Sequence, residues 1–202
     1  MSFAEKCFKV FTRCVEDFHS RGGVETEFFN PYEKDGFEYY LYQKAWIDSR
    51  QWHLEDQIRE EGIDAQTALG LKRQIDGLNQ ERTDAVERLD DYFVEEFRGV
   101  KPLADARLNT ESLAWALDRL SILALKIYHM RQEVERECVA LTHRERCREK
   151  LFVLNGQRED LLLAITQLRE DILAGRRYMK VYRQMKMYND PELNPVLYGQ
   201  KK

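Results

Sequence analysis

Two short segments of this chain concentrate side chains that could bind a ligand or a metal ion. Residues 46–56 hold two of the three tryptophans, one of the four histidines and three carboxylates. Residues 107–122 contain the run Arg107-Leu-Asn-Thr-Glu-Ser112 and then Asp118-Arg-Leu-Ser-Ile122. Buried charges must be paired, neutralised or bound to a ligand. We therefore expect either a structural network or a binding site in these segments.

Helical geometry spreads the first segment over several faces. At 100° per residue, Ile47 and Leu54 fall on an ordinary core face, Trp46 and His53 share a second arc, and Asp56 lies on a third. A helix on the surface would not normally carry tryptophans on two further faces. This helix is therefore predicted to be enclosed on more than one side, with some of its charges desolvated.

Two arginines interrupt apolar stripes elsewhere in the chain. Arg82 and Arg158 stand at core-like positions, while Asp118 lies among apolar neighbours. One interpretation is that carboxylates pair with these arginines and fix helix register. The other is that the same groups line a pocket for a phosphate-bearing or sugar-like ligand. The candidate pocket residues are His53, Glu55, Asp56, Arg59, Arg82, Asn109, Glu111, Asp118 and Arg158.

A divalent metal ion is a third interpretation of the same residues. His53 and Asp56 are one turn apart, and Glu111 and Asp118 could add oxygen ligands. There is, however, no His-Glu-x-x-His motif and no Cys-x-x-Cys spacing, so no metal ligand is assigned. Neither a Gly-x-Ser-x-Gly motif nor a glycine-rich phosphate loop occurs. The sequence therefore predicts no reaction, and it leaves open whether the protein is an enzyme and which cofactor it uses.

The elements that position these residues are predicted to be helices. Proline is absent from 32–101 and from 103–190, and apolar residues recur at steps of three and four. Helices are expected over about 2–20, 37–61, 64–98, 110–141 and 142–174, with a shorter one over 176–188. A capping-box pattern at Thr142-x-x-Glu145 is expected to start the fifth. The predicted fold is all-α, an antiparallel bundle of about five long helices plus a short C-terminal helix. It forms a single domain, 1–202, with 189–202 as an extended tail, and its long stripes also suit a coiled-coil homo-oligomer.

The positions of the cysteines and the distribution of charge limit which kinds of protein this chain can be. All four cysteines occupy positions of small core residues, and a bridge is conceivable only between Cys138 and Cys147. The net charge of the chain is −4, but it is uneven: residues 175–202 carry +5 and residues 1–174 carry −9. An acidic body with a basic tail argues against a general nucleic-acid-binding protein. The basic and aromatic segment 176–188 is expected to pack through Met179, Tyr182, Met185 or Lys186, with RNA, a membrane surface or phosphate as alternatives.

The expected cellular compartment is inferred from two kinds of segment that the sequence lacks, a membrane span and a signal peptide. No apolar run approaches the roughly 18 residues that cross a bilayer, so no membrane span is expected. The first residues lack the layout of a signal peptide. We therefore expect a cytoplasmic protein.

The motifs themselves resemble those of a bacterial family, domain of unknown function 4254. The resemblance is carried by the Trp-Ile-Asp-x-x-Gln-Trp-His-Leu-Glu-Asp run at 46–56, by Asn109-Thr-Glu-Ser112, by 118–122 and by 180–189. No activity comes with this family. Its association with glycosyltransferase genes of surface-polysaccharide assembly implies an accessory or sugar-nucleotide role, with a glycosyltransferase as partner.

Two functions remain in view. The first is a helical bundle whose polar pocket binds a phosphate-bearing or nucleotide-sugar ligand. The alternative is a non-catalytic, dimeric scaffold in which the polar clusters only set helix packing.

Overall fold

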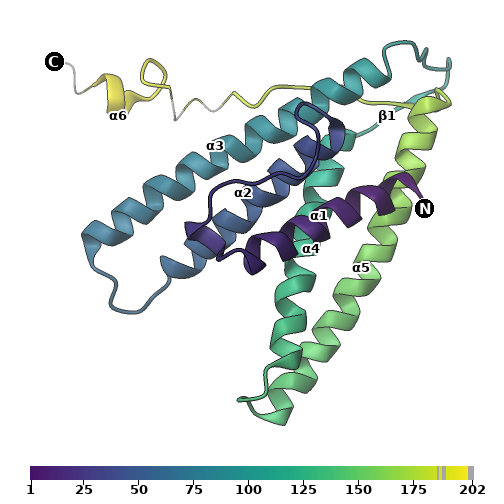
Figure 1. Ribbon diagram of the computed structural model, residues 1–202. Helices are drawn as coiled ribbons and strands as arrows, with labels where there is room; N and C mark the ends of the chain where they lie inside the picture. Colours follow the sequence, from purple (N-terminus) through teal and green to yellow (C-terminus); the bar gives the residue numbers. More distant parts are fainter. Residues whose placement is uncertain (186, 188–189, 200–202) are drawn as a thin grey trace.

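A computed structural model of the protein describes residues 1–185, 187 and 190–199 (Figure 1). Within these residues the fold is all-α, as predicted. The elements in chain order are α1 (Phe3–Ser20), η1 (Gly23–Glu25), α2 (Phe37–Gln57), α3 (Ala65–Glu96), β1 (Arg107–Leu108), α4 (Leu113–Glu135), α5 (Leu141–Leu173), β2 (Arg177–Tyr178) and α6 (Pro195–Tyr198).

Two long helical hairpins form the frame of the molecule. Figure 1 shows α2 and α3 as one antiparallel pair and α4 and α5 as another, with α1 crossing over them. Helix α4 contacts α1, α2, α3 and α5, so it has a central position in the fold. None of the described helices is long and apolar enough to cross a lipid bilayer.

Three of the five long helices, α1, α3 and α4, begin where short polar side chains satisfy free backbone N–H groups. The Ser2 side chain accepts from Glu5 N in a capping box, and the Asp64 carboxylate accepts from Gln66 N and Thr67 N at the start of α3. Ser112 caps α4 by accepting from Trp115 N. The cap therefore falls a few residues beyond the predicted start near 110, because the segment before it is extended.

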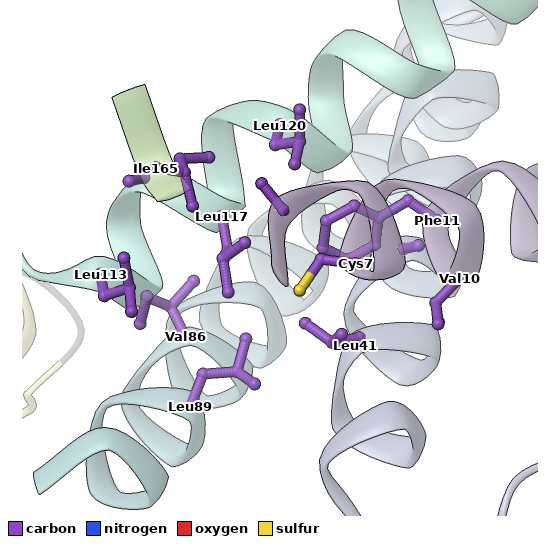
Figure 2. Packing of buried hydrophobic residues seen from close by; sticks show 14 of the residues in the cluster. Cys7, Val10, Phe11, Leu41, Val86, Leu89, Leu113, Leu117, Leu120 and Ile165 are labelled. Atoms are coloured by element: carbon purple, nitrogen blue, oxygen red, sulfur yellow. The ribbon is translucent and has the colours of Figure 1, made fainter. Parts of the chain in front are cut away.

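One hydrophobic core joins all five long helices. Figure 2 shows Cys7 and Phe11 of α1, Leu41 of α2 and Leu89 of α3 packed around Leu117 of α4. Ile165 of α5 completes the same cluster. A smaller cluster, centred on Leu54 and Leu78, fills the far end of the α2–α3 hairpin. The two clusters fix where polar groups can be buried.

A turn at Gly175, just after α5, brings the chain back beside the segment that precedes α4. Gly175 has φ of 72°, and a Cβ added there would lie 2.8 Å from the Lys101 carbonyl oxygen. The Leu103 N–H donates to the Gly175 carbonyl at 2.9 Å. This close approach allows β2 to pair with β1 in parallel, with Arg107 opposite Arg177. The two-residue strands place Asn109 and Arg177 at one edge of the bundle.

Two sequence predictions about local structure were wrong. No capping box starts α5, which begins at Leu141 after Ala140 without a side-chain cap. Cys138, expected at a core position, lies exposed in the α4–α5 turn because α4 ends at Glu135, and Leu141 is exposed at the start of α5. All four cysteines are free thiols, so the conceivable bridge to Cys147 is not formed.

The predicted helix over 176–188 is also wrong for its described part. Residues 177–178 form β2, and 179–185 are not helical. Met179 packs against the core as expected, whereas Tyr182 and Met185 are exposed. The packing expected of Lys186 lies outside the described residues. Arg183 holds the tail to α3 by ion pairs with Glu87 and Asp91.

Candidate functional site

A network of charged side chains is buried where α2, α3 and α4 meet. Lys44 and Asp48 lie one turn apart on α2, and the Lys44 Nζ contacts Asp48 Oδ2 at 2.5 Å and Asp118 Oδ1 at 2.8 Å. Arg82 of α3 binds Asp118 through two nitrogens, at 3.0 and 2.5 Å. The Ser121 hydroxyl donates to Asp48 Oδ2 at 2.6 Å. Two cations thus neutralise two carboxylates in a buried site.

The pKa values of Asp48 and Asp118 are shifted in opposite directions. Burial raises the pKa of Asp48, and the contacts from Lys44 and Ser121 do not fully offset it. Burial also acts to raise the pKa of Asp118, but Lys44 and Arg82 outweigh it, so the Asp118 pKa is lowered. Among the described residues Asp48 Oδ1 has no hydrogen-bond partner, although Arg82 Nε lies 3.5 Å away in a longer ion pair. Asp118 is therefore the more strongly held anion of the pair.

A pocket of about 830 Å³ opens beside this network. Arg82 and Asp118 form one part of its lining, and α4 and α5 form most of the rest. Arg82 is 31% exposed, so it connects the buried network to the pocket. The volume lies within the range of about 300–1,000 Å³ that is usual for small-molecule sites.

Further polar side chains line the pocket near the two short strands. Arg177 donates to Asn109 Oδ1 at 3.1 Å and pairs with Asp171 Oδ2 at 3.3 Å. Arg119 pairs with Glu111 at 3.1 Å. These pairs are partly exposed to solvent, so each contributes little to stability and can exchange its partner for a ligand.

The opposite part of the pocket mixes amides, charges and apolar groups. Gln157, Asp160 and Gln167 come from α5, and Lys126 comes from α4. Apolar lining is provided by Ile122, Leu123, Leu161, Ile165 and Leu168. The lining thus offers hydrogen-bond donors, acceptors and both signs of charge.

The structure brings four of the nine sequence candidates together in this pocket, and these are Arg82, Asn109, Glu111 and Asp118. The other five do not line it. Glu55 and Arg59 form an ion pair at the end of α2, with Arg59 67% exposed. Asp56 is exposed beside them. Arg158 lies on the opposite side of α5, where it pairs with Glu159 and stacks over Phe8 of α1.

His53 belongs to a separate cluster of three histidines. One ring nitrogen from each of His19, His53 and His129 lies within 4.8 Å of the others. Burial lowers the pKa of His19 and of His53, and burial together with the other two rings lowers the pKa of His129 to about 4. The metal interpretation that joined His53 to Asp56, Glu111 and Asp118 does not match this arrangement, because Glu111 and Asp118 line the pocket instead.

Sequence reasoning missed several residues that matter here. Lys44 is fully buried, and its spacing of four from Asp48 was a readable signal for an ion pair. Arg177 lines the pocket because β2 pairs with β1, and no local sequence pattern predicted this pairing. His19 ends α1, where a basic residue ordinarily interacts with the helix terminus.

Comparison with protein-family models gives a match over most of the chain. A family model described as a protein of unknown function, DUF4254, matches residues 38–181. The matched region covers every residue that lines the pocket, from Arg82 to Arg177, and it includes His53 and His129 but not His19. No curated protein and no solved structure gives a significant match.

Proposed function

Since the chain belongs to the DUF4254 family, whose description names no activity, we propose its function from the pocket itself: it binds a small phosphate-bearing sugar, free or within a nucleotide sugar. The observation that carries this proposal is the pocket of about 830 Å³ whose lining holds four cationic side chains, Arg82, Arg119, Lys126 and Arg177, beside four carboxylates, Glu111, Asp118, Asp160 and Asp171. A phosphate group is a good partner for such a set, because arginine presents paired donors to its oxygens.

The phosphate would bind near the short strands. Arg119 and Arg177 are each held by a partly exposed carboxylate, Glu111 and Asp171 respectively. A doubly charged phosphate can compete for these arginines, because exposed ion pairs are weak. Arg82 is held in a fixed position at the pocket, since Asp118 orients it through two contacts.

The sugar hydroxyl groups would bind on the side of α5. Gln157, Asp160 and Gln167 offer acceptors and amide donors there, and Asn109 offers an amide near the strands. Sugar hydroxyls both donate and accept, so they match a lining of amides and carboxylates. This ligand class would suit an accessory role beside a glycosyltransferase, the partner that the family resemblance implied.

The test is a binding titration by calorimetry with three probes: inorganic phosphate, a hexose 1-phosphate and a uridine diphosphate hexose. The Arg177→Gln variant should bind the preferred probe about tenfold or more weakly, because it loses a charged hydrogen bond. Arg98→Gln is the matched control, since Arg98 is 76% exposed at the end of α3 and lies outside the pocket. If none of the probes binds, or if both variants bind equally well, the proposal is wrong.

A second candidate, a dimeric scaffold, is favoured by one observation. Helix α5 exposes Phe152, Val153 and Leu163, which are 81%, 56% and 58% accessible. Large apolar side chains grouped on one helix are typical of a contact between proteins. Light scattering should then show a dimer that Phe152→Asp dissociates. A monomer at every accessible concentration would exclude this candidate.

A further inference from the structure

Three histidines from three different helices meet where α1, α2 and α4 are in contact. His19 is in the last turn of α1, His53 in the last turns of α2, and His129 in α4. The Nε2 atoms of His19 and His53 are 3.0 Å apart. With His129, the set offers three ring nitrogens within 4.8 Å of one another. From this geometry we propose that His19, His53 and His129 together bind one divalent transition-metal ion of the zinc class.

The distances suit such an ion. Zinc binds histidine nitrogen at about 2.0–2.1 Å, which places two ligands of a tetrahedral site roughly 3.3 Å apart. The His19–His53 separation of 3.0 Å is already close to that value. The nitrogen of His129 lies no more than 4.8 Å from the other two, so it must approach them for all three to bind one ion. Three imidazoles and no carboxylate favour zinc, copper, nickel or cobalt over magnesium and calcium, which prefer oxygen ligands.

One backbone contact prepares His19 for this role. The Nδ1 of His19 lies 2.6 Å from the Val15 carbonyl oxygen. A carbonyl can only accept, so Nδ1 carries the proton and Nε2 presents its lone pair toward His53. In the metal-free protein the His53 Nε2–H therefore donates to His19. When the ion binds, this proton moves to Nδ1 of His53, and both Nε2 lone pairs bind the metal. Metal-ligating histidines commonly have such a carbonyl contact behind them.

An unpartnered atom points independently to a ligand. The Nε2 of His129 is buried and has no hydrogen-bond partner in the described part of the chain. Leaving such a group unpaired in a buried position is unfavourable. A metal ion at the cluster would give the imidazole of His129 a partner that the helices do not supply.

Aromatic neighbours hold each ring in place. Trp52 stacks on His129 with centroids 4.8 Å apart and planes 6° apart. Tyr128 lies over His19 at 4.3 Å, and Phe18 stacks on His53 at 5.6 Å. Rings held by packing are preorganised, so little freedom is lost when the ion binds. The three histidines are half-buried, which leaves one side of the ion open to water or to a fourth ligand.

The test is a zinc titration of the untagged chain against a chromophoric chelator. We expect one zinc ion per chain, with no competition from magnesium. His129→Phe keeps an aromatic ring against Trp52 but removes the ligand, and it should weaken zinc binding by about 100-fold or more, at least the loss seen for outer contacts of metal sites. His143→Phe is the matched control, because His143 is the remaining histidine and contacts Glu133 and Cys147 elsewhere.

A second measurement does not depend on the variants folding. Cobalt bound to the wild-type chain should show the visible absorption of a tetrahedral site without the thiolate charge-transfer band. Absence of zinc binding, a thiolate band, or binding lost in His143→Phe but kept in His129→Phe would each overturn the proposal. Because the cluster shares no residue with the pocket lining, these outcomes are independent of the sugar-phosphate proposal.

Discussion

Arg82 and Asp118 are joined by two parallel contacts, Nε to Oδ1 at 3.0 Å and Nη2 to Oδ2 at 2.5 Å. The same carboxylate also receives Lys44 Nζ at 2.8 Å. A single side chain of α4 therefore neutralises cations of both α2 and α3. This arrangement makes Asp118 the residue on which the packing of the three helices depends most directly.

Substitution of Asp118 by asparagine should destabilise the protein strongly. The change keeps the shape of the side chain but leaves Lys44 and Arg82 with one carboxylate between them, and breaking a buried pair in this way costs about 3–5 kcal/mol. The free energy of unfolding from urea titration measures the loss. Asp160→Asn, on the exposed face of α5 in the same pocket, should change stability by less than about 0.5 kcal/mol. Equal losses in the two variants would show that the network contributes nothing.

The contribution of Asp118 should disappear in acid. Burial acts to raise the pKa of Asp118 in the folded protein, but Lys44 and Arg82 lower it by more, so the folded pKa lies below the ordinary value. As the pH falls, the unfolded chain therefore takes up the proton first, and stability decreases until the folded pKa is passed. Urea titrations between pH 7 and about pH 3 should show the wild type approaching Asp118→Asn at the acidic end. A stability difference that does not change with pH would contradict this assignment of charge.

The hydroxyl of Ser121 should matter more than that of another buried serine. Ser121 donates to Asp48 Oδ2 across two helices at 2.6 Å, whereas Ser49 donates to the Ala45 carbonyl within its own helix. Ser121→Ala removes a partner of a buried charge and should cost about 1–3 kcal/mol. Ser49→Ala should cost less than about 1 kcal/mol, because the carbonyl keeps its helical hydrogen bond. Thermal or urea unfolding of the two variants decides between these values.

Two glycines should respond to alanine in opposite directions. Gly175→Ala places a Cβ against the Lys101 carbonyl at a left-handed backbone position, so it should destabilise by at least about 1–2 kcal/mol. It should also weaken ligand binding, because this turn aligns β2 with β1. Gly156 lies within α5 with open space around it, so Gly156→Ala should stabilise by about 0.5–1 kcal/mol. Unfolding curves of both variants, with the pocket titration repeated, provide the measurement.

The four thiols should react at two very different rates. Cys138 is exposed, whereas Cys7, Cys14 and Cys147 are buried. Burial raises the pKa of Cys7 to about 12 and that of Cys14 well above its usual value, which suppresses the reactive thiolate. A thiol reagent should label one cysteine per native chain quickly and all four after denaturation. Rapid labelling of more than one native thiol would mean that the core opens readily.

The sequence predicted the elements well because hydrophobic periodicity is a local signal. It also indicated the burial of Asp118, which lies among apolar neighbours, and the unusual position of Arg82, which interrupts an apolar stripe. The sequence did not predict which other residues join Asp118 and Arg82 in the pocket. Asn109 and Arg177 are brought together by strand pairing between segments that are distant in sequence, and that pairing depends on the turn at Gly175.

The histidine cluster shows the same limit. His19, His53 and His129 are spread over 111 positions, and no motif relates them. Each looks ordinary within its own helix, and only the crossing of α1, α2 and α4 brings their rings together. The predicted pairing of His53 with Asp56 relied on the nearest neighbours in sequence, whereas the neighbours in space come from other helices.

The buried quartet of Lys44, Asp48, Arg82 and Asp118 also restricts how this protein can change over generations. Each single replacement leaves an odd charge inside the bundle, so the individual effects will not add. An apolar version of the same fold is reached only by replacing opposite charges together, through intermediates that fold poorly. Lineages that carry this network are therefore expected to keep it as a set or to lose it as a set.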